Sequence, residues 1–322
     1  MHLMLEEIES EPAIIRDFKS KEFENFDHIT SNLELSRMVY VVGNGTSYHA
    51  AQYLSILLNR NGKNSIPILS SEVGNWLPGM IPNTTSIVFS QSGDSIDALN
   101  SAEELKRKGS MVIGITNNRD AKLRKIANLM LYTDAGNERS VAATKSLIAQ
   151  LFVALKISYH SKKSEFLEIL NEAEKNTETI VTGKKVIREL VGQAKGRTVF
   201  LGSGLAYPIA LETTLKLIET SNAISFAYAT RDFLHGPKQL LDRKWSVFML
   251  SPDRLVFHEL DSYAKRVVDV DEFLQQKFGV TSENEVVKSM QSLLFGQLLS
   301  YYTSISLGLD PDRPSRLTKV VK

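Results

Sequence analysis

Two short turns rich in hydroxyl and amide side chains follow predicted strands and lead into predicted helices. They read GNGTS at residues 43–47 and SQSGDS at residues 90–95. Glycine lets the backbone approach a ligand closely and helix N-termini favour anions, so such turns can hold a phosphate without Lys or Arg. Simple capping of two helices is the alternative. Because both turns belong to one half of the chain, we favour a phosphate site with six candidate residues: Thr46, Ser47, Ser90, Gln91, Ser92 and Ser95.

Residues suited to proton transfer lie in the second half of the chain. Glu212, Lys216 and Glu219 are spaced i, i+4 and i+7, so they share one face of a predicted helix. A surface ladder of ion pairs is the common explanation for this spacing. His235 lies sixteen residues beyond Glu219 and directly precedes a Gly-Pro turn. A carboxylate and an imidazole on adjacent elements can move protons on a sugar, so we take these residues as the candidate acid–base group.

The elements that must position these residues alternate between short apolar strands and longer helices. Strands are predicted at residues 38–42, 66–69, 86–89, 111–115, 129–132, 198–201 and 246–250. Helices are predicted to end near residues 58, 107 and 219 and to cover residues 141–159 and 286–306. Strands that alternate with helices in this way predict parallel sheets covered on both faces.

An internal repeat relates the two halves of the chain. The segment YVVGNGTSYHAAQYL, which begins at residue 40, matches VFLGSGLAYPIALET at an offset of 159. The shared frame of strand, Gly-x-Gly turn, tyrosine and helix predicts two copies of one α/β unit. The second copy has Ser251, Pro252 and Asp253 where the first has its hydroxyl-rich SQSGDS turn. We therefore expect one phosphate site per chain, built by the first copy.

The composition is that of a globular protein with little net charge. The 322 residues include 38 Lys+Arg and 37 Asp+Glu, which argues against nucleic acid or an anionic membrane as a partner. No apolar run approaches the roughly 18 residues of a membrane span and no secretion signal is recognisable, so we expect a cytoplasmic protein. The absence of cysteine excludes thiol nucleophiles, and the six His residues show no HxH or HExxH spacing. We expect neither a metal nor a cofactor.

Seven segments, taken in order, resemble proteins of the sugar-phosphate-binding SIS family. They are EEIESEPAIIRDF, VVGNGTSYHA, SQSGDS, AGNERSVAATKS, GLAYPIALETTLKLIE, HGPKQLL and GLDPDRPSRLTK. Within the family, the chain is similar to the isomerase half of glutamine–fructose-6-phosphate aminotransferases and to stand-alone glucosamine-6-phosphate deaminases. The resemblance implies an α/β fold with two tandem doubly wound parallel-sheet domains of flavodoxin-like type. The expected limits are residues 1–30 for an N-terminal helical arm, 31–165 for the first domain, 166–192 for a helical connector, and 193–322 for the second domain with its C-terminal tail.

The resemblance also implies which residues bind the substrate. Ser47 and the turn at residues 90–95 would hold the phosphate, with Ser95 standing where the family commonly has Thr. Val141 and Ala143 would line the sugar site, and Ala143 replaces a serine that is often found there. The bound molecule would be a small sugar phosphate.

Catalytic roles follow from the same resemblance. Glu219 would carry the proton between C1 and C2 of the sugar, with Lys216 and Glu212 in support. His235 would open the sugar ring in the site of a neighbouring subunit, which implies a homodimer. Lys319 would lie at the carbonyl or imine carbon.

The expected reaction is the deamination of glucosamine 6-phosphate to fructose 6-phosphate. The sequence begins at the SIS portion, and it has no cysteine with which to release ammonia from glutamine, so we expect no glutaminase activity. Three alternatives remain open: a deglycase that acts on a 6-phosphorylated fructosamine, a plain aldose–ketose phosphate isomerase, and a non-catalytic sugar-phosphate sensor. Release of ammonia distinguishes the deaminase from the plain isomerase and from the non-catalytic sensor.

Overall fold

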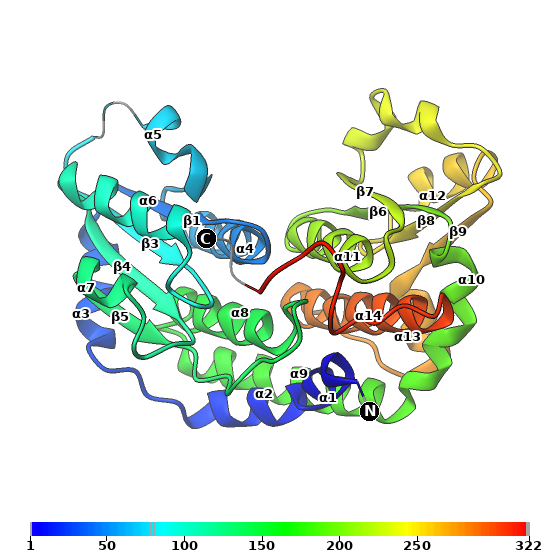
Figure 1. Ribbon diagram of the computed structural model, residues 1–322, viewed down its shortest axis with the longest axis horizontal. Coiled ribbons are helices and arrows are strands. Elements are labelled where there is room, and N and C mark those ends of the chain that lie inside the picture. The colour runs from blue at the N-terminus through cyan, green and yellow to red at the C-terminus, as the bar shows by residue number, and fades with distance from the viewer. Residues whose placement is uncertain (1, 78, 80, 320–322) are drawn as a thin grey trace. The chain divides into compact units, whose positions relative to one another are not determined.

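The computed structural model describes residues 2–77, 79 and 81–319 and contains two separate parallel β-sheets flanked by helices (Figure 1). Contacts divide the chain into two compact units, each built on one sheet. The β1–β5 unit comprises residues 14–138, 145–167 and the chain from Thr318 onward; the β6–β9 unit comprises the chain up to Ala13 together with residues 139–144 and 168–317. No helix in the described parts of the chain combines the length and the apolar character needed to cross a bilayer.

The first sheet has the strand order β2-β1-β3-β4-β5, with every pair parallel. Its strands are β1 (Met38–Gly43), β2 (Ser65–Leu69), β3 (Thr84–Phe89), β4 (Met111–Thr116) and β5 (Leu129–Tyr132). Strand β3 is buried along its whole length, as expected for a central strand with helices on both faces. The associated helices are α3 (Phe26–Leu35), α4 (Thr46–Arg60), α5 (Val73–Trp76), α6 (Ile96–Arg107), α7 (Leu123–Ile126) and α8 (Lys145–Ser158).

The second sheet has the parallel order β7-β6-β8-β9. Its strands are β6 (Arg197–Gly202), β7 (Ile224–Ala229), β8 (Trp245–Met249) and β9 (Arg266–Asp269). The accompanying helices are α1 (Leu3–Glu9), α10 (Val191–Ala194), α11 (Ala206–Ser221), α12 (Arg254–Asp261), α13 (Val270–Phe278) and α14 (Glu285–Ser306). The remaining α-helices are α2 (Glu11–Ser20) and α9 (Lys163–Gly183). The predicted class, two doubly wound parallel-sheet domains, is confirmed.

The structure corrects the predicted elements in two places. Strands β7 and β9 were not predicted; both lie at the edges of the second sheet, and outward-facing Ile224 and Phe226 of β7 are exposed. The helix predicted at residues 141–159 begins only at Lys145, so Val141 and Ala143 lie in irregular backbone before it. The start is fixed by the Glu138 side chain, which accepts hydrogen bonds from the Ser146 N–H at 3.0 Å and the Ser146 hydroxyl at 2.7 Å.

The two halves share the turn that follows their first strand. Adding the predicted offset of 159 residues to the bounds of β1 gives the bounds of β6. A Cβ on Gly43 would lie 2.4 Å from the Ser47 carbonyl oxygen, and one on Gly202 would lie 2.2 Å from the Ala206 carbonyl oxygen. Only glycine fits so close to backbone, which explains why both copies have glycine at the strand end.

Helix α11 is packed tightly against α14. A Cβ on Gly296 of α14 would lie 2.2 Å from Oγ1 of Thr213, so the two helices approach each other closely at this point. The Thr220 hydroxyl of α11 also donates to the Ser300 carbonyl of α14 at 3.4 Å. Helix α11 contacts strand β6 as well, so it is held from two sides.

Candidate functional site

The two hydroxyl-rich turns lie at one edge of the first sheet. Strands β1 and β3 are parallel neighbours, and the chain leaves β1 toward β2 on one side and reaches β3 on the other. This is the switch point at which doubly wound sheets bind ligands. The Asn44 side chain, in the turn after β1, donates to Oδ2 of Asp97 in the first turn of α6 at 2.9 Å. The structure therefore brings the two predicted turns together.

The turn after β3 is shaped by its own hydroxyl groups. The Ser90 hydroxyl accepts from the Gly93 N–H at 3.1 Å, and the Ser92 hydroxyl accepts from the Asp94 N–H at 3.2 Å. Gly93 has a φ of 66°, and a Cβ there would lie 2.4 Å from that of Ala121, so glycine is required. Ser95 precedes α6 without capping it through its side chain. The first N–H groups of α6 are thus not satisfied by the Ser95 hydroxyl.

Ser47 is fixed by a residue that the sequence did not suggest. Its side chain is almost buried, and its Oγ accepts a hydrogen bond from Nε2 of Gln150 in α8 at 3.3 Å. Gln150 is 1% exposed in a helix whose buried face is otherwise mostly apolar. A buried amide at an apolar position was the available signal, because such groups are retained where they find a polar partner. Thr46 is half-buried in the first turn of α4.

In the second copy, an aspartate carboxylate occupies the position that corresponds to the turn after β3. Asp253, after β8, caps α12 by accepting from the N–H groups of Leu255 at 3.1 Å and Val256 at 3.3 Å. The Arg231 guanidinium donates to it at 2.8 Å and, with the Val256 N–H, lowers the pKa of Asp253. A carboxylate at this helix N-terminus leaves little electrostatic attraction for a phosphate.

The predicted acid–base residues of α11 form a compact cluster. Nζ of Lys216 lies 2.5 Å from Oε2 of Glu219 and 3.3 Å from Oε1 of Glu212. The side chains of Lys216 and Glu212 are 1% and 0% exposed, whereas that of Glu219 is 19% exposed. The common explanation of a surface ladder is therefore wrong for this triplet. Glu219 is therefore the member of the cluster that solvent reaches.

The electrostatics of the cluster favour a permanent cation at its centre. Burial by itself would lower the pKa of Lys216, but the carboxylates of Glu212 and Glu219 outweigh that effect and raise the pKa. The two carboxylates therefore favour the charged form of Lys216. The cluster combines one buried ion pair with one carboxylate at the surface.

His235 is placed apart from these contacts. It ends a short 3-10 turn, η3 (Asp232–Leu234), and its side chain is exposed. Across the described residues, its ring makes no hydrogen bond or ion pair that would join it to Glu219 or Lys216. Gly236, with a φ of 128°, starts the next turn, η4 (Pro237–Leu240). An exposed imidazole on a short turn is available to a partner or a ligand.

Lys319 forms a close ion pair in the β1–β5 unit. Its Nζ lies 2.7 Å from Oε2 of Glu138, whose side chain is 0% exposed. The same carboxylate holds the N-terminus of α8 through Ser146. Glu138 was not predicted as a site residue, although it lies within the family segment AGNERSVAATKS. Of the predicted sugar-lining residues, Val141 donates its N–H to the Asp312 carbonyl at 3.2 Å, and Ala143 is half-buried.

One group of side chains in the described residues has the spacing of metal ligands: His2, Asp310 and Asp312. Both carboxylate oxygens of Asp312 already accept backbone hydrogen bonds, from the N–H groups of Leu3 at 2.8 Å and Met4 at 2.7 Å. The carboxylate therefore serves as the cap of α1. We assign no metal to this group.

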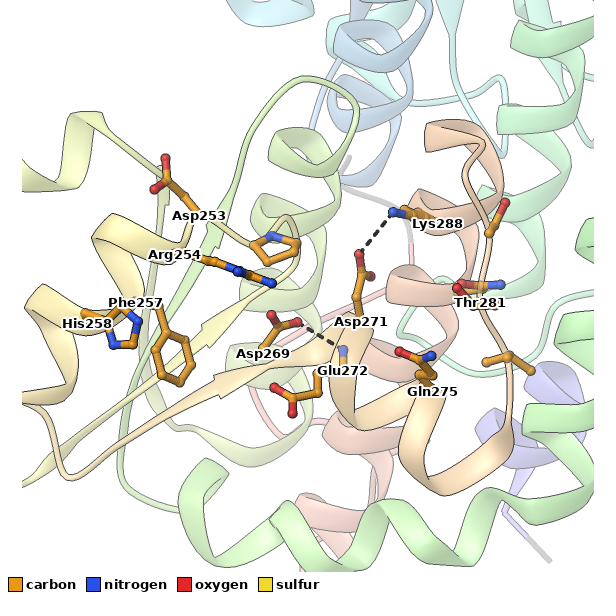
Figure 2. Close-up of a pocket in the computed structure, with 14 residues that line it drawn as sticks. Asp253, Arg254, Phe257, His258, Asp269, Asp271, Glu272, Gln275, Thr281 and Lys288 are labelled. Carbon is orange, nitrogen blue, oxygen red and sulfur yellow. Dashed lines mark hydrogen bonds and ion pairs between the residues drawn. The ribbon is translucent and has the colours of Figure 1, made fainter.

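A cavity of about 600 Å³ lies in the β6–β9 unit, at the carboxyl ends of β8 and β9 (Figure 2). Asp271, in the first turn of α13, faces Lys288 of α14, with Oδ2 and Nζ 3.8 Å apart. Burial raises the pKa of Asp271 to about 6; the Lys288 ammonium opposes this shift and the Asp269 carboxylate adds to it. The folded protein therefore keeps a proton on Asp271 at a pH where the unfolded chain has lost it.

Replacement of Asp271 by Asn is expected to make the protein more stable at neutral pH. The folded state binds more protons than the unfolded state between about pH 4 and pH 6, so the free energy of unfolding decreases as the pH rises through that window. Removing the group should raise the free energy of unfolding by about 1–3 kcal/mol at pH 7.5 and leave it unchanged at pH 4. Urea denaturation at both pH values measures this difference. Glu272→Gln, on the same turn, is the control, and equal stability of D271N and wild type at pH 7.5 would contradict the assignment.

Comparisons with known proteins find related sequences for both units of the chain. The profile of the SIS domain matches residues 33–157 and 192–268. The glutamine–fructose-6-phosphate aminotransferase [isomerizing] of Sulfolobus acidocaldarius is 30% identical over 99% of this chain and 56% of its own length. The chain thus spans a little over half the length of such curated relatives.

Two solved structures are similar over nearly all of the chain. The C-terminal domain of the glucosamine–fructose-6-phosphate aminotransferase from Francisella tularensis has a TM-score of 0.85 at 23% identity, with 97% of this chain and 98% of that chain covered. A glucosamine-6-phosphate deaminase from Thermotoga maritima has a TM-score of 0.80 at 27% identity, with 99% of each chain covered. With two Gly-x-Gly turns on parallel sheets and a match over most of its length, this chain belongs to the SIS domain family.

Proposed function

We propose that this chain is a glucosamine-6-phosphate deaminase, which converts glucosamine 6-phosphate and water into fructose 6-phosphate and ammonia. The observation that carries the proposal is the Glu219 carboxylate, which is partly exposed and lies 2.5 Å from a buried ammonium. A catalytic base needs access to its substrate and a fixed position; the partial exposure of Glu219 and its contact with Lys216 support this role. The similarity to the deaminase of Thermotoga maritima along the whole chain supports this choice among sugar-phosphate reactions.

The substrate phosphate is bound by the two turns of the β1–β5 unit. Because the Ser47 hydroxyl accepts its hydrogen bond from Gln150, its own proton is available to a phosphate oxygen. The N-terminus of α6, which Ser95 does not cap through its side chain, offers backbone N–H groups. The remaining hydroxyl and amide donors in this role are Thr46, Ser90, Gln91 and Ser92.

Proton transfer is assigned to the α11 cluster. In the open-chain substrate, Glu219 removes the proton from C2 and delivers it to C1, while one N–H proton passes to the C1 oxygen. The product is a 2-imine with a hydroxyl group on C1. Water adds to C2, ammonia leaves, and the ketone of fructose 6-phosphate remains, so that all atoms balance. Lys216 positions the Glu219 carboxylate and Glu212 holds Lys216.

The other predicted residues take supporting roles in the proposal. His235 transfers the proton that opens the sugar ring, acting in the site of a second subunit, and its exposed position on a short turn suits this role. Lys319 supplies a cation at the reacting carbonyl or imine carbon, with Glu138 fixing its position. Val141 and Ala143 line the sugar. Activity regained on mixing inactive Glu219 and His235 variants would support a shared homodimeric site, and no regain would count against it.

Ammonia release tests the proposed reaction directly. The purified chain should release one ammonia for each fructose 6-phosphate formed from glucosamine 6-phosphate, with no change when EDTA is added. A panel containing a fructosamine 6-phosphate and an amine-free aldose phosphate covers the competing reactions. Ammonia-free isomerisation of the aldose phosphate, preferential cleavage of the fructosamine, or thermal stabilisation by glucosamine 6-phosphate without turnover would each replace the proposal with one of its three alternatives.

A further inference from the structure

The cavity at the carboxyl ends of β8 and β9 is lined by residues with no role in the proposed reaction. It is built by the loop after β8, the first turns of α12 and α13, residues 280–282 and one face of α14. None of the α11 residues lines it. At about 600 Å³ it has the volume of a site for a small organic molecule.

The charges of the cavity favour a cation over an anion. The lining contains four carboxylates but only two permanent cations and one histidine. The carboxylates are those of Asp253, Asp269, Asp271 and Glu272; the basic residues are Arg254, Lys288 and His258. Figure 2 shows Asp269 at the end of β9 and Asp271 in the first turn of α13, with Lys288 facing Asp271 from α14. The helix N-terminus that could attract an anion is already capped by Asp269, which accepts from the Glu272 N–H at 3.1 Å.

Two buried polar atoms in the cavity lack partners among the described residues. Nε2 of Gln291 has no hydrogen-bond acceptor, although Gln291 is only 2% exposed. Oδ1 of Asp271 has no donor, because the ion pair with Lys288 is made through Oδ2 at the long distance of 3.8 Å. An unmade hydrogen bond at a buried donor costs free energy, so orphaned groups of this kind point to a ligand. Gln291 offers a donor and Asp271 an acceptor.

We propose that this cavity binds a small polar molecule that carries a primary ammonium group beside an oxygen acceptor. The ammonium group donates to Oδ1 of Asp271, and Nε2 of Gln291 donates to the acceptor. A bare metal ion does not fit, because the cavity carboxylates do not converge at ligand distances in the described residues. Amino sugars and α-amino acids share the required chemistry. The site is separate from the Glu219 cluster, so the inference stands independently of the proposed reaction.

Matched pairs of probes test the need for the ammonium group. The full chain is titrated calorimetrically with D-glucosamine and D-glucose, and with L-alanine and L-lactate, since the members of each pair differ by an ammonium group in place of a hydroxyl. Hydrogen exchange of the segment 269–291 locates the binding. We expect saturable binding and protection with at least one amine and neither with its hydroxyl analogue. Binding of glucosamine would identify an amino sugar as the ligand class, and binding of alanine an α-amino acid.

Three variants complete the test. Asp271→Asn and Gln291→Leu should each weaken amine binding about tenfold or more, as expected for the loss of a hydrogen bond to a charged group or of a buried partner. Gln291→Leu should not reduce stability, because its amide has no partner to lose, and neither variant should change sugar-phosphate turnover. Glu283→Gln, exposed and outside the cavity lining, is the control. Binding that does not distinguish amines from hydroxyl analogues, binding unchanged in both variants, or saturation by inorganic phosphate at this segment would overturn the proposal.

Discussion

Replacement of Glu219 by Gln is expected to reduce the turnover of glucosamine 6-phosphate by about 10²–10⁴-fold. The substitution keeps the shape of the side chain and its hydrogen bond with Lys216, but an amide cannot accept the C2 proton. Substrate binding should change little, because the phosphate donors belong to the turns after β1 and β3. The expected signature is a loss in kcat with KM nearly unchanged, measured by ammonia release over a range of substrate concentrations.

A surface ion pair provides the control for this variant. Nζ of Lys238 and Oε1 of Glu259 also lie 2.5 Å apart, but their side chains are 40% and 37% exposed. Glu259→Gln therefore weakens an equally short Lys–Glu contact without removing the proposed base, and its turnover should match wild type. A Glu219→Gln protein that releases ammonia at the wild-type rate would show that another group moves the proton.

Replacement of Lys216 by Met is expected to have the largest effect on stability. Removing one partner of a buried ion pair leaves the other charge in a poorly solvated place, which costs about 3–5 kcal/mol. Glu212 is 0% exposed, so water cannot replace the lost ammonium group. Methionine has a similar length, which limits the size of any cavity. Urea denaturation at pH 7 would measure the loss, and turnover should fall as well because Glu219 loses its positioning residue.

The matched surface variant separates charge burial from loss of contacts. Lys238→Met breaks the exposed pair with Glu259 and should cost about 0–1 kcal/mol. Adding Glu212→Gln to the Lys216→Met chain should restore part of the lost stability, since the buried charge is then removed. Equal losses for the buried and the surface lysine, or no recovery in the double variant, would show that the α11 cluster does not act as a buried charge pair.

The sequence predicted the fold well where the signals are local. Short stretches of sequence are enough to show the alternation of strands and helices, the Gly-x-Gly turns and the 159-residue offset. The predicted bounds of β1 and β6 are correct to within a residue or two. Strand β7 was missed because Ile224 and Phe226 are exposed and no continuous buried apolar run marks it. Strand β9 was missed because only Val267 and Val268 stand between the charged residues Arg266 and Asp269. The division of the chain at residues 165 and 192 stays a prediction.

The parts of the site that the sequence missed depend on contacts between distant residues. Gln150 contacts Ser47 across 103 positions, and Lys319 contacts Glu138 across 181. Helical spacing placed Glu212 and Lys216 on one face but carried no information on its burial. That burial depends on packing around α11, to which α14 contributes from more than seventy residues further along the chain.

The close approach of Gly296 to Thr213 also bears on how the protein can move during a catalytic cycle. Because there is no room for even a methyl group between α14 and α11 at this point, neither helix can slide past the other without unpacking. If Glu219 acts as proposed, α11 holds its carboxylate in place and the substrate has to approach it. Exposed segments with few buried contacts, such as His235 and Gly236 between the two short turns, are better placed to move. The pace of ring opening and product release would then be set by loop rearrangement, on a timescale slower than the proton transfer itself.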